Sequence, residues 1–145
     1  MTTVRVVLLD PTLPLPVAAK PGDAGVDLRS RVATTIAPRG RALVPTGIAI
    51  ALPQGFAGFI VPRSGLALNH GITCLNAPGL IDSGYRGEIA CILHNTDEEH
   101  AFTVEKGDRI AQLVIQRVEG VEFVEVDQLD ETARGDGGFG HSGRN

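Results

Sequence analysis

The sequence lacks a run of apolar residues that could cross a membrane, because no stretch approaches the roughly 20 apolar residues that a spanning helix needs. Its first residues, MTTVRVVLLDPTLPLP, hold one arginine and a short apolar run, and they lack the apolar segment of a secretory signal. Net positive charge is also lacking, since 13 Lys and Arg stand against 17 Asp and Glu, which argues against binding to nucleic acid or anionic membranes through bulk charge. We therefore expect a cytoplasmic protein.

The few cysteine and histidine residues lack the spacing of metal ligands. Cys74 and Cys91 are expected to be small buried hydrophobic residues with reduced thiols. The histidines, at positions 70, 94, 100 and 141, form neither an HxxxH nor an HExxH pattern, which disfavours a zinc site built by the protein.

Helical periodicity is nearly absent, and short segments rich in Val and Ile lie between Pro and Gly residues. This pattern predicts strands over residues 4–9, 42–52, 56–61, 89–93, 102–104, 110–118 and 121–126. One or two helical turns are expected within SGLALNHG, with Ser64 as the N-cap and Gly71 as the stop. The pattern predicts an all-β sandwich, jelly roll or distorted barrel, and 145 residues suit one domain.

Glycine is concentrated near the C-terminus, in the stretch RGDGGFGHSG over residues 134–143. The surrounding sequence has almost no residues that could form a core, and glycine loses more backbone entropy on ordering than any other residue. Within a single domain over residues 1–145, we expect residues from about 131 to 145 to form an arm that is mobile when nothing is bound. A P-loop is excluded, because the stretch lacks GK[ST] and no strand leads into it.

Most polar residues outside the expected strands lie in five glycine-bearing segments: AGVDLRS (24–30), PRSGLA (62–67), GLIDSGYRGEI (79–89), GDRIAQLV (107–114) and RGDGGFGHSG (134–143). Four of them place an arginine next to or near a glycine, which lets a guanidinium and backbone amides approach one anion together. Each segment alone also fits an ordinary turn. Taken together and in this order, the segments resemble the five motifs of the trimeric dUTPase family, over residues 24–144.

The resemblance implies a jelly-roll-like β-barrel that assembles as a homotrimer with shared active sites. It also implies an enzyme that hydrolyses dUTP to dUMP and pyrophosphate, with Mg²⁺ on the triphosphate. Such an activity limits uracil in DNA and supplies dUMP for dTMP synthesis.

The third segment and its neighbourhood would bind the nucleoside and perform the chemistry. In the family motif the aspartate, here Asp82, orients and deprotonates the attacking water, and such general-base help is worth about 10² to 10⁴ in rate. Tyr85 would lie beneath the deoxyribose, where the 2′-hydroxyl of a ribose would collide with its ring. Asn76 would read the uracil edge together with backbone groups of Leu80, Ile81 and Asp82. From the residues alone, Asp82 also fits a turn and Tyr85 a core position.

The second, fourth and first segments would hold the triphosphate. The resemblance implies phosphate contacts from Arg63, Ser64 and Gly65, with backbone N–H groups at a short helix start favouring an anion. Gln112 would face the phosphates, although a glutamine on a strand could equally face solvent. Asp27 would help to hold Mg²⁺ through water, since this ion keeps several waters and takes substrate phosphates as direct ligands.

The C-terminal arm would close over a bound nucleotide. Phe139 would stack on the uracil, which is worth roughly 1 to 3 kcal/mol. Arg134 and the amides of Ser142 and Gly143 would reach the phosphates, where a leaving pyrophosphate accumulates charge.

Two alternatives and one departure accompany the resemblance. A dCTP deaminase-type relative would need an acid/base glutamate at the base, for which Glu88 is in the neighbourhood. A catalytically silent nucleotide-binding module would keep the barrel but lose the water-activating residue or the arm. Many family members have an acidic residue before the tyrosine, where this chain has Gly84, and we expect this difference to change the flexibility of the hairpin more than the chemistry.

Overall fold

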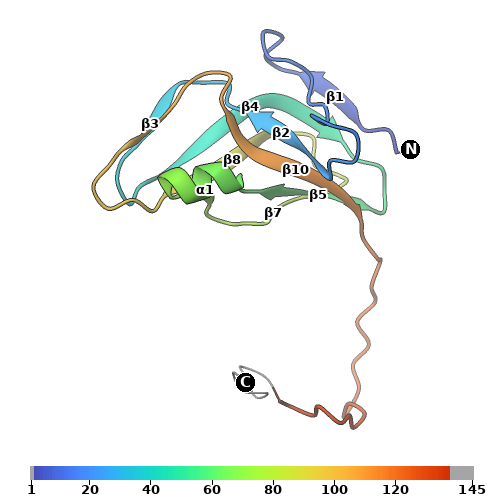
Figure 1. The fold of residues 1–145 in the computed structure, drawn as a ribbon. Helices are drawn as coiled ribbons and strands as arrows, with labels where there is room; N and C mark the ends of the chain where they lie inside the picture. Colours follow the sequence, from blue (N-terminus) through green and yellow to red (C-terminus); the bar gives the residue numbers. More distant parts are fainter. Residues whose placement is uncertain (1, 138–145) are drawn as a thin grey trace.

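The computed structural model describes residues 2–137, and it confirms the all-β prediction. Antiparallel strands form two four-stranded sheets and a two-stranded ribbon that together enclose the core (Figure 1). The first sheet has the order β1-β4-β8-β6, formed by Arg5–Leu8, Arg41–Ala51, Glu88–Asn95 and Ile72–Cys74. The second has the order β2-β10-β5-β7, formed by Gly25–Arg29, Arg109–Arg117, Phe56–Val61 and Gly79–Ile81, and the ribbon pairs β3 (Thr34–Ile36) with β9 (Phe102–Val104).

The core lies between the inner faces of the two sheets. Strand β8 buries every second residue, because successive side chains of a strand point to opposite faces. Its Ile89, Cys91 and Leu93 pack with Leu28 of β2 and Ile60 of β5 in one continuous apolar cluster. Burying a side chain of this size contributes about 1.5 to 3 kcal/mol, so this cluster is the main source of the barrel's stability.

Both cysteines are buried and free, as the sequence predicts. Burial raises the pKa of the Cys91 thiol to about 12, and the neighbouring Cys74 adds to this effect. Both thiols therefore remain protonated at neutral pH.

The one helix among residues 2–137 is α1, Ser64–His70, which lies on the outside of the barrel and has no buried residue (Figure 1). Gly71 ends it in the left-handed conformation with φ of 64°, as predicted. The prediction of Ser64 as the N-cap is wrong, because Arg63 occupies that position and no side chain caps the helix start. Within residues 2–137 no helix is long and apolar enough to span a membrane.

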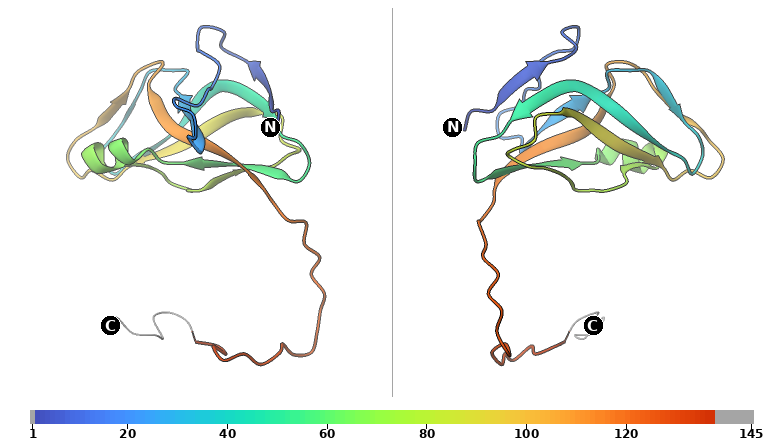
Figure 2. Two further views of the ribbon diagram at one scale, coloured as in Figure 1. Left: turned by 45° about the vertical axis from the view of Figure 1, so that its right-hand side comes forward. Right: turned by 180° about the vertical axis from the view of Figure 1, so that it is seen from behind.

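Predicted strands over 4–9, 42–52, 56–61, 89–93, 102–104 and 110–118 are confirmed with small shifts at their ends. Strands β2, β3, β6 and β7 were not predicted, since each has only three to five residues and carries glycine or threonine. The strand predicted over 121–126 is wrong: after β10 the chain runs away from the barrel (Figures 1 and 2), and Phe123 is 94% exposed. The irregular C-terminal stretch therefore begins at residue 118.

Candidate active site

A cavity of about 360 Å³ opens beside β7 and β8 and contains the residues predicted to bind the nucleoside. Its lining combines an apolar floor with polar groups at the β7–β8 connection. The predicted residues that line it are Asn76, Leu80, Ile81, Asp82 and Tyr85, and Glu88 joins them. A concave, mostly apolar site with a few convergent polar groups is typical of small-molecule binding.

The connection from β7 to β8 is a tight turn that presents Asp82 at its start. The backbone N–H of Tyr85 donates to the carbonyl of Asp82 at 3.1 Å. Arg86 supports the turn from outside, donating from Nη1 to the carbonyls of Ser83 (2.6 Å) and Tyr85 (2.7 Å). A Cβ built at Gly84 would meet nothing within 4 Å, so this turn has room for a side chain at position 84.

Tyr85 folds back over the turn instead of entering the core, and it is 45% exposed. Its hydroxyl donates to the backbone carbonyl of Glu88 at 3.0 Å. The ring occupies the space where residue 87 would carry a side chain, because a Cβ at Gly87 would lie 2.6 Å from the ring carbon Cζ. Glycine at position 87 is therefore required for this placement of the ring.

Asn76 lies at the other side of the cavity, in the loop between β6 and β7. A Cβ at Gly79 would lie 3.3 Å from Asn76 Nδ2 and 3.3 Å from the Cβ of Ile60. Gly79 thus allows the Asn76 amide to lie close to the backbone of β7, where an amide can offer both a donor and an acceptor.

Glu88 reaches the same cavity but its carboxylate is already bound. Arg31 Nη1 lies 3.1 Å from Oε1 and 3.0 Å from Oε2, and the backbone N–H of Gly47 donates to Oε1 at 2.8 Å. These contacts give the Glu88 side chain a structural role, and they disfavour its use as the free acid/base that deamination would need.

The residues predicted to hold phosphate and metal gather around Asp27 on β2. Arg109 Nη1 donates to Asp27 Oδ2 at 3.3 Å, and Arg63 Nε lies 3.2 Å from Oδ1. The Arg63 contact is an ion pair without hydrogen-bond alignment, so the buried Oδ1 has no hydrogen-bond partner within residues 2–137. Arg63 Nη1 also donates to the carbonyl of Arg109 at 3.1 Å, which ties the two arginines together.

Gln112 lies directly opposite Asp27 in the β2–β10 register, so the two side chains share one face of the sheet. Its half-buried position fits a group that faces a ligand as well as one that faces solvent. Ser64 and Gly65 form the exposed first turn of α1, directly after Arg63.

The structure therefore brings the predicted residues together in two groups. None of Asp27, Arg63 or Gln112 lines the 360 Å³ cavity, and no nucleoside-side residue contacts the Asp27 cluster by a hydrogen bond or ion pair within residues 2–137. Within residues 2–137, the side chain of the arm residue Arg134 makes only a local hydrogen bond, from Nε to the carbonyl of Gly137 at 3.0 Å. Phe139, Ser142 and Gly143 lie outside the described residues.

Two residues in these groups were not predicted from the sequence. Arg109 lies inside the GDRIAQLV segment, and its position two residues after a glycine was an available signal. Arg31 follows the first segment by one residue and had no signal, because its partner Glu88 is 57 positions away.

Comparisons with known proteins agree with the resemblance. A family model described as dUTPase matches residues 12–143. A deoxyuridine 5′-triphosphate nucleotidohydrolase of Thermobifida fusca is 61% identical over 143 residues, covering 97% of this chain and 80% of the relative. One from Corynebacterium glutamicum is 54% identical over 144 residues, covering 99% of this chain and 97% of the relative.

Solved structures of similar fold are also dUTPases. The Staphylococcus bacteriophage 80alpha dUTPase, solved with dUpNHpp, has a TM-score of 0.89 and 28% identity, covering 99% of this chain and 100% of the phage chain. A dUTPase of phage phi11 of S. aureus, described with a structural Mg(II) ion, shares the fold with a TM-score of 0.79 and 24% identity, covering 89% of this chain and 99% of its own. The family model spans most of the residues, and the relatives exceed half identity over nearly the whole length. This chain therefore belongs to the dUTPase family.

Proposed function

We propose that this protein is a dUTP diphosphatase, which hydrolyses dUTP to dUMP and pyrophosphate. The observation that carries the proposal is the cavity beside β7 and β8, where Asn76, Asp82 and Tyr85 converge on a space large enough for a nucleoside. Family membership and relatives named for this activity support the same conclusion.

The cavity would select the nucleoside by shape and by hydrogen bonds. The Asn76 amide would pair with O4 and N3–H of uracil, a pattern that the amine of cytosine does not match. Leu80 and Ile81 would add backbone contacts and close the space that the methyl group of thymine would need. Tyr85 would lie under the deoxyribose, so that a ribose 2′-hydroxyl would collide with the ring.

Asp82 would act as the general base. It lies at the start of the β7–β8 turn, at the polar side of the cavity, where a water molecule can reach its carboxylate. As the water oxygen bonds to the α-phosphorus, its proton passes to Asp82, and the bond from that phosphorus to the α,β-bridging oxygen breaks to release pyrophosphate. This assignment uses no protein nucleophile, so no covalent intermediate forms.

Phosphate binding would fall to the Asp27 cluster and the arm. Arg63, Ser64, Gly65 and Gln112 would contact the triphosphate, and Arg109 carries a second guanidinium within the same cluster. From the arm, Arg134, Phe139, Ser142 and Gly143 would complete the closed site, with Phe139 on the uracil face.

The residues around Asp27 fit a Mg²⁺ ion that the substrate holds. Within residues 2–137 no group of three or more His, Cys, Asp or Glu side chains could cage a metal. Asp27 Oδ1, which faces Arg63 but accepts no hydrogen bond within residues 2–137, is suited to accept one from a metal-bound water. When bound, Mg²⁺ would neutralise charge on the triphosphate and orient it for in-line attack.

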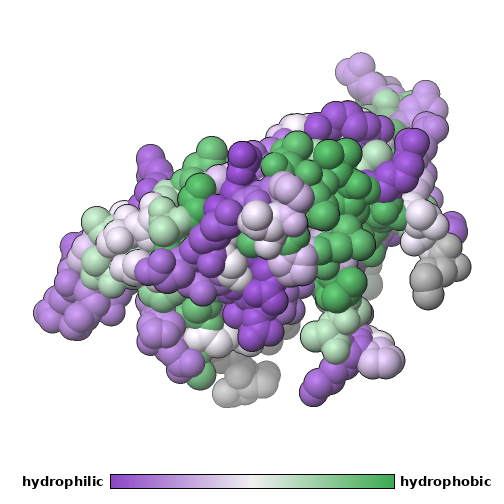
Figure 3. Space-filling model, turned by 90° about the horizontal axis from the view of Figure 1, so that it is seen from above, coloured by the Kyte–Doolittle hydropathy of each residue, from purple (hydrophilic) through white to green (hydrophobic). Residues whose placement is uncertain are grey.

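A homotrimer with shared active sites would join the two groups of residues. The irregular segment after β10 leaves apolar side chains uncovered, among them Val121, Phe123 and Leu129. Apolar side chains also gather on the face of the barrel that Figure 3 shows, and Val7 and Val17 are among the exposed apolar residues of the chain. Surfaces of this kind are covered in protein–protein contacts, and further copies of this chain are the partners we propose.

We also propose that residues 1–145 form one domain with a C-terminal arm, and that the protein acts in the cytoplasm. The single continuous core over β2 to β10 supports the first statement, and the two free thiols suit a reducing compartment. There the activity would limit uracil in DNA and supply dUMP for dTMP synthesis.

The test measures pyrophosphate release from dUTP, dTTP, dCTP and UTP with Mg²⁺, and ammonia release from dCTP in parallel. We expect much faster hydrolysis of dUTP than of the other three nucleotides, and no ammonia. A chain truncated after Ala133 should lose about 5- to 150-fold in kcat/KM, the equivalent of the 1 to 3 kcal/mol for base stacking, with an unchanged circular dichroism spectrum. Ammonia release would favour a deaminase, and absence of any turnover with tight dUTP binding would favour a silent binding module.

A further inference from the structure

The start of β8, which follows the turn that begins at Asp82, is joined to a bulge in β4 by a cluster that the proposed mechanism does not use. In the β4–β8 pairing, Pro45 faces Ala90 and Ala49 faces Glu88, so four steps along β4 correspond to two along β8. The extra residues of β4 form a bulge around Gly47, whose φ is 74°. Its backbone cannot follow the regular ladder and needs other hydrogen-bond partners.

Glu88 supplies one of those partners. Its Oε1 accepts from the Gly47 N–H at 2.8 Å, while the carbonyl of Gly47 accepts from the N–H of Leu9 at 2.7 Å. Next to Gly47 on β4, Thr46 Oγ1 donates to the carbonyl of Ile89 on β8 at 2.7 Å. The first residues of β8 are thus held against the bulge by side chains as well as by backbone.

Arg31 completes the cluster from the loop after β2. Its Nη1 contacts both oxygens of Glu88 at 3.0 and 3.1 Å, and its own backbone N–H donates to the carbonyl of Pro45 at 2.8 Å. Because Arg31 is anchored to β4 through its backbone and to β8 through its side chain, it fixes where Glu88 lies relative to the bulge.

Tyr85 depends on the position of Glu88. Its hydroxyl donates to the Glu88 carbonyl at 3.0 Å, and the ring covers Gly87, the residue immediately before. A shift of Glu88 would move this hydrogen-bond acceptor and so release the ring, since this is the one hydrogen bond that the Tyr85 side chain makes within residues 2–137.

We propose that Arg31, acting through Glu88, positions the Tyr85 ring and thereby sets how strictly the site rejects ribonucleotides. This inference rests on the proposed function, in which Tyr85 lies under the sugar. Arg31 is a positioning residue: its guanidinium binds a carboxylate whose own backbone carbonyl holds the tyrosine hydroxyl. A ring free to tilt would leave room for a 2′-hydroxyl, so UTP would be hydrolysed more readily.

The chain offers a direct optical reading of this ring, because Tyr85 is its one tyrosine and tryptophan is absent. The tyrosine band in near-ultraviolet circular dichroism therefore reports whether the Tyr85 ring is fixed. The test compares the full-length protein with Arg31→Met, Arg31→Lys and Glu88→Gln. Arg39→Met is the matched control, since it removes the same charge from another ion pair, with Glu98.

For Arg31→Met we expect a weaker tyrosine band and a ratio of kcat/KM for UTP to that for dUTP that rises about tenfold, in the range by which one small group discriminates in a pocket. The kcat for dUTP should change much less than this ratio. Glu88→Gln should act in the same direction, and Arg31→Lys, which keeps the charge, should recover most of both signals. Arg39→Met should match the original protein.

The proposal is overturned if Arg31→Met gives the same band and the same substrate ratio as Arg39→Met. If the tyrosine band weakens while the ratio of kcat/KM for UTP to that for dUTP stays constant, Arg31 positions the ring but does not set the selectivity, and that part of the proposal is overturned. Should Arg31→Met fail to fold, Glu88→Gln answers the same question. A native protein that does not hydrolyse dUTP would refute the proposed function instead, and the tyrosine band would still decide whether Arg31 positions the ring.

Discussion

Strand β8 and the segment over residues 121–126 were both predicted as strands but have opposite surroundings. Residues 89–93 of β8 form a continuous apolar run, and residues 121–126 alternate apolar with charged residues over part of their length. In β8 every second side chain is buried, whereas Val121, Phe123, Val124 and Val126 are all more than half exposed. An apolar segment therefore indicates that a face must be covered, and it does not indicate which molecule covers it.

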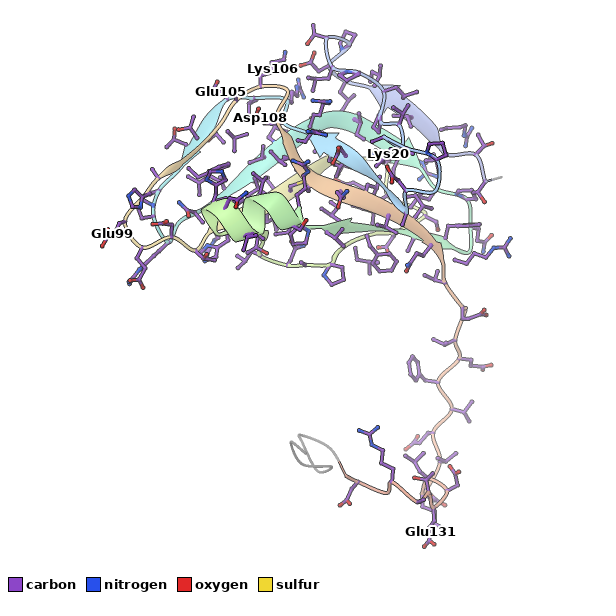
Figure 4. All side chains as sticks on the ribbon, viewed as in Figure 1. Lys20, Glu99, Glu105, Lys106, Asp108 and Glu131 are labelled. Carbon is purple, nitrogen blue, oxygen red and sulfur yellow. The ribbon has the colours of Figure 1, made fainter. Side chains whose placement is uncertain are left out.

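The two long irregular segments, residues 9–24 between β1 and β2 and residues 118–137 after β10, also differ in how they contact the barrel. Residues 9–24 have almost no regular structure, yet Leu13 is buried and the N–H groups of Leu9 and Asp10 donate to the Gly47 carbonyl. Residues 118–137 make one backbone hydrogen bond to the barrel, from Val118 to Gly55 at 3.0 Å. Figure 4 shows Glu131 on this segment, well away from the barrel. The N-terminal segment is thus part of the barrel, and the C-terminal segment is available to a partner.

The largest expected effect comes from the barrel, because the proposed general base is there. Asp82→Asn should lower kcat for dUTP by about 10² to 10⁴, since an amide cannot take the proton of the attacking water. KM should change little, because the amide has nearly the same size. Steady-state pyrophosphate release measures both constants. A variant that retains full kcat would remove Asp82 from the chemistry and leave the arm as the main catalytic contribution.

The second prediction concerns the buried face of β8. Leu93→Ala should lower the free energy of unfolding by about 2 to 5 kcal/mol, because Leu93 is fully buried and truncation leaves a cavity. Urea denaturation at fixed protein concentration measures the change. A loss below this range would mean that the core around β8 relaxes to fill the space.

The corresponding change in the irregular segment after β10 should act on assembly. Phe123→Ala should weaken the proposed trimer by about 1.5 to 3 kcal/mol per chain, the value of burying a side chain of this size against a partner. Sedimentation over a range of concentrations would then give dissociation at higher protein concentration than for the original protein. If assembly is unaffected, Phe123 stays exposed in the oligomer, and no partner chain covers residues 121–126 as the barrel covers β8.

Much of the barrel could be predicted from the sequence because its long strands carry runs of Val and Ile with clear turns between them. Strand β3 could not, since it has three residues, two of them threonine, and is stabilised by pairing with the distant β9. A strand was wrongly predicted over 121–126 because its alternating pattern favours a face that is covered. The pattern contains no information on which surface covers that face.

The nucleoside-side residues were predicted through ordered motifs, and Asn76, Asp82 and Tyr85 do line one cavity. Their separation from the Asp27 cluster was not visible in the sequence, because motif order says nothing of distance in space. Arg31 was missed for a related reason: its role depends on a bulge at Gly47 and a carboxylate on another strand, and neither is encoded near position 31.

The smallest expected effect lies in the N-terminal segment, where Asp10 forms the anchor that the arm lacks. Asp10 Oδ2 lies 2.8 Å from Lys106 Nζ, on the β9–β10 turn where Figure 4 labels this lysine, and Oδ1 accepts from Thr12. The hydrogen bond from Lys106, followed by those from Thr12, lowers the pKa of the Asp10 carboxyl from 3.8 to about 2. A lowered pKa in the folded state means that the ionised carboxylate stabilises the fold above the unfolded value, and that this contribution disappears as the pH falls from 3.8 to about 2.

Asp10→Asn should therefore be less stable than the original protein at neutral pH, and the difference should shrink as the pH falls from 3.8 and disappear below about 2, where the carboxyl is protonated. Urea denaturation across this acid range measures the difference. Asp130→Asn, which removes the same charge from the exposed arm, is the matched control and should follow the original protein at every pH. If the two variants behave alike, the Asp10 contacts do not hold residues 9–24 to the barrel, and the two irregular segments differ only through the burial of Leu13 and the backbone hydrogen bonds to Gly47.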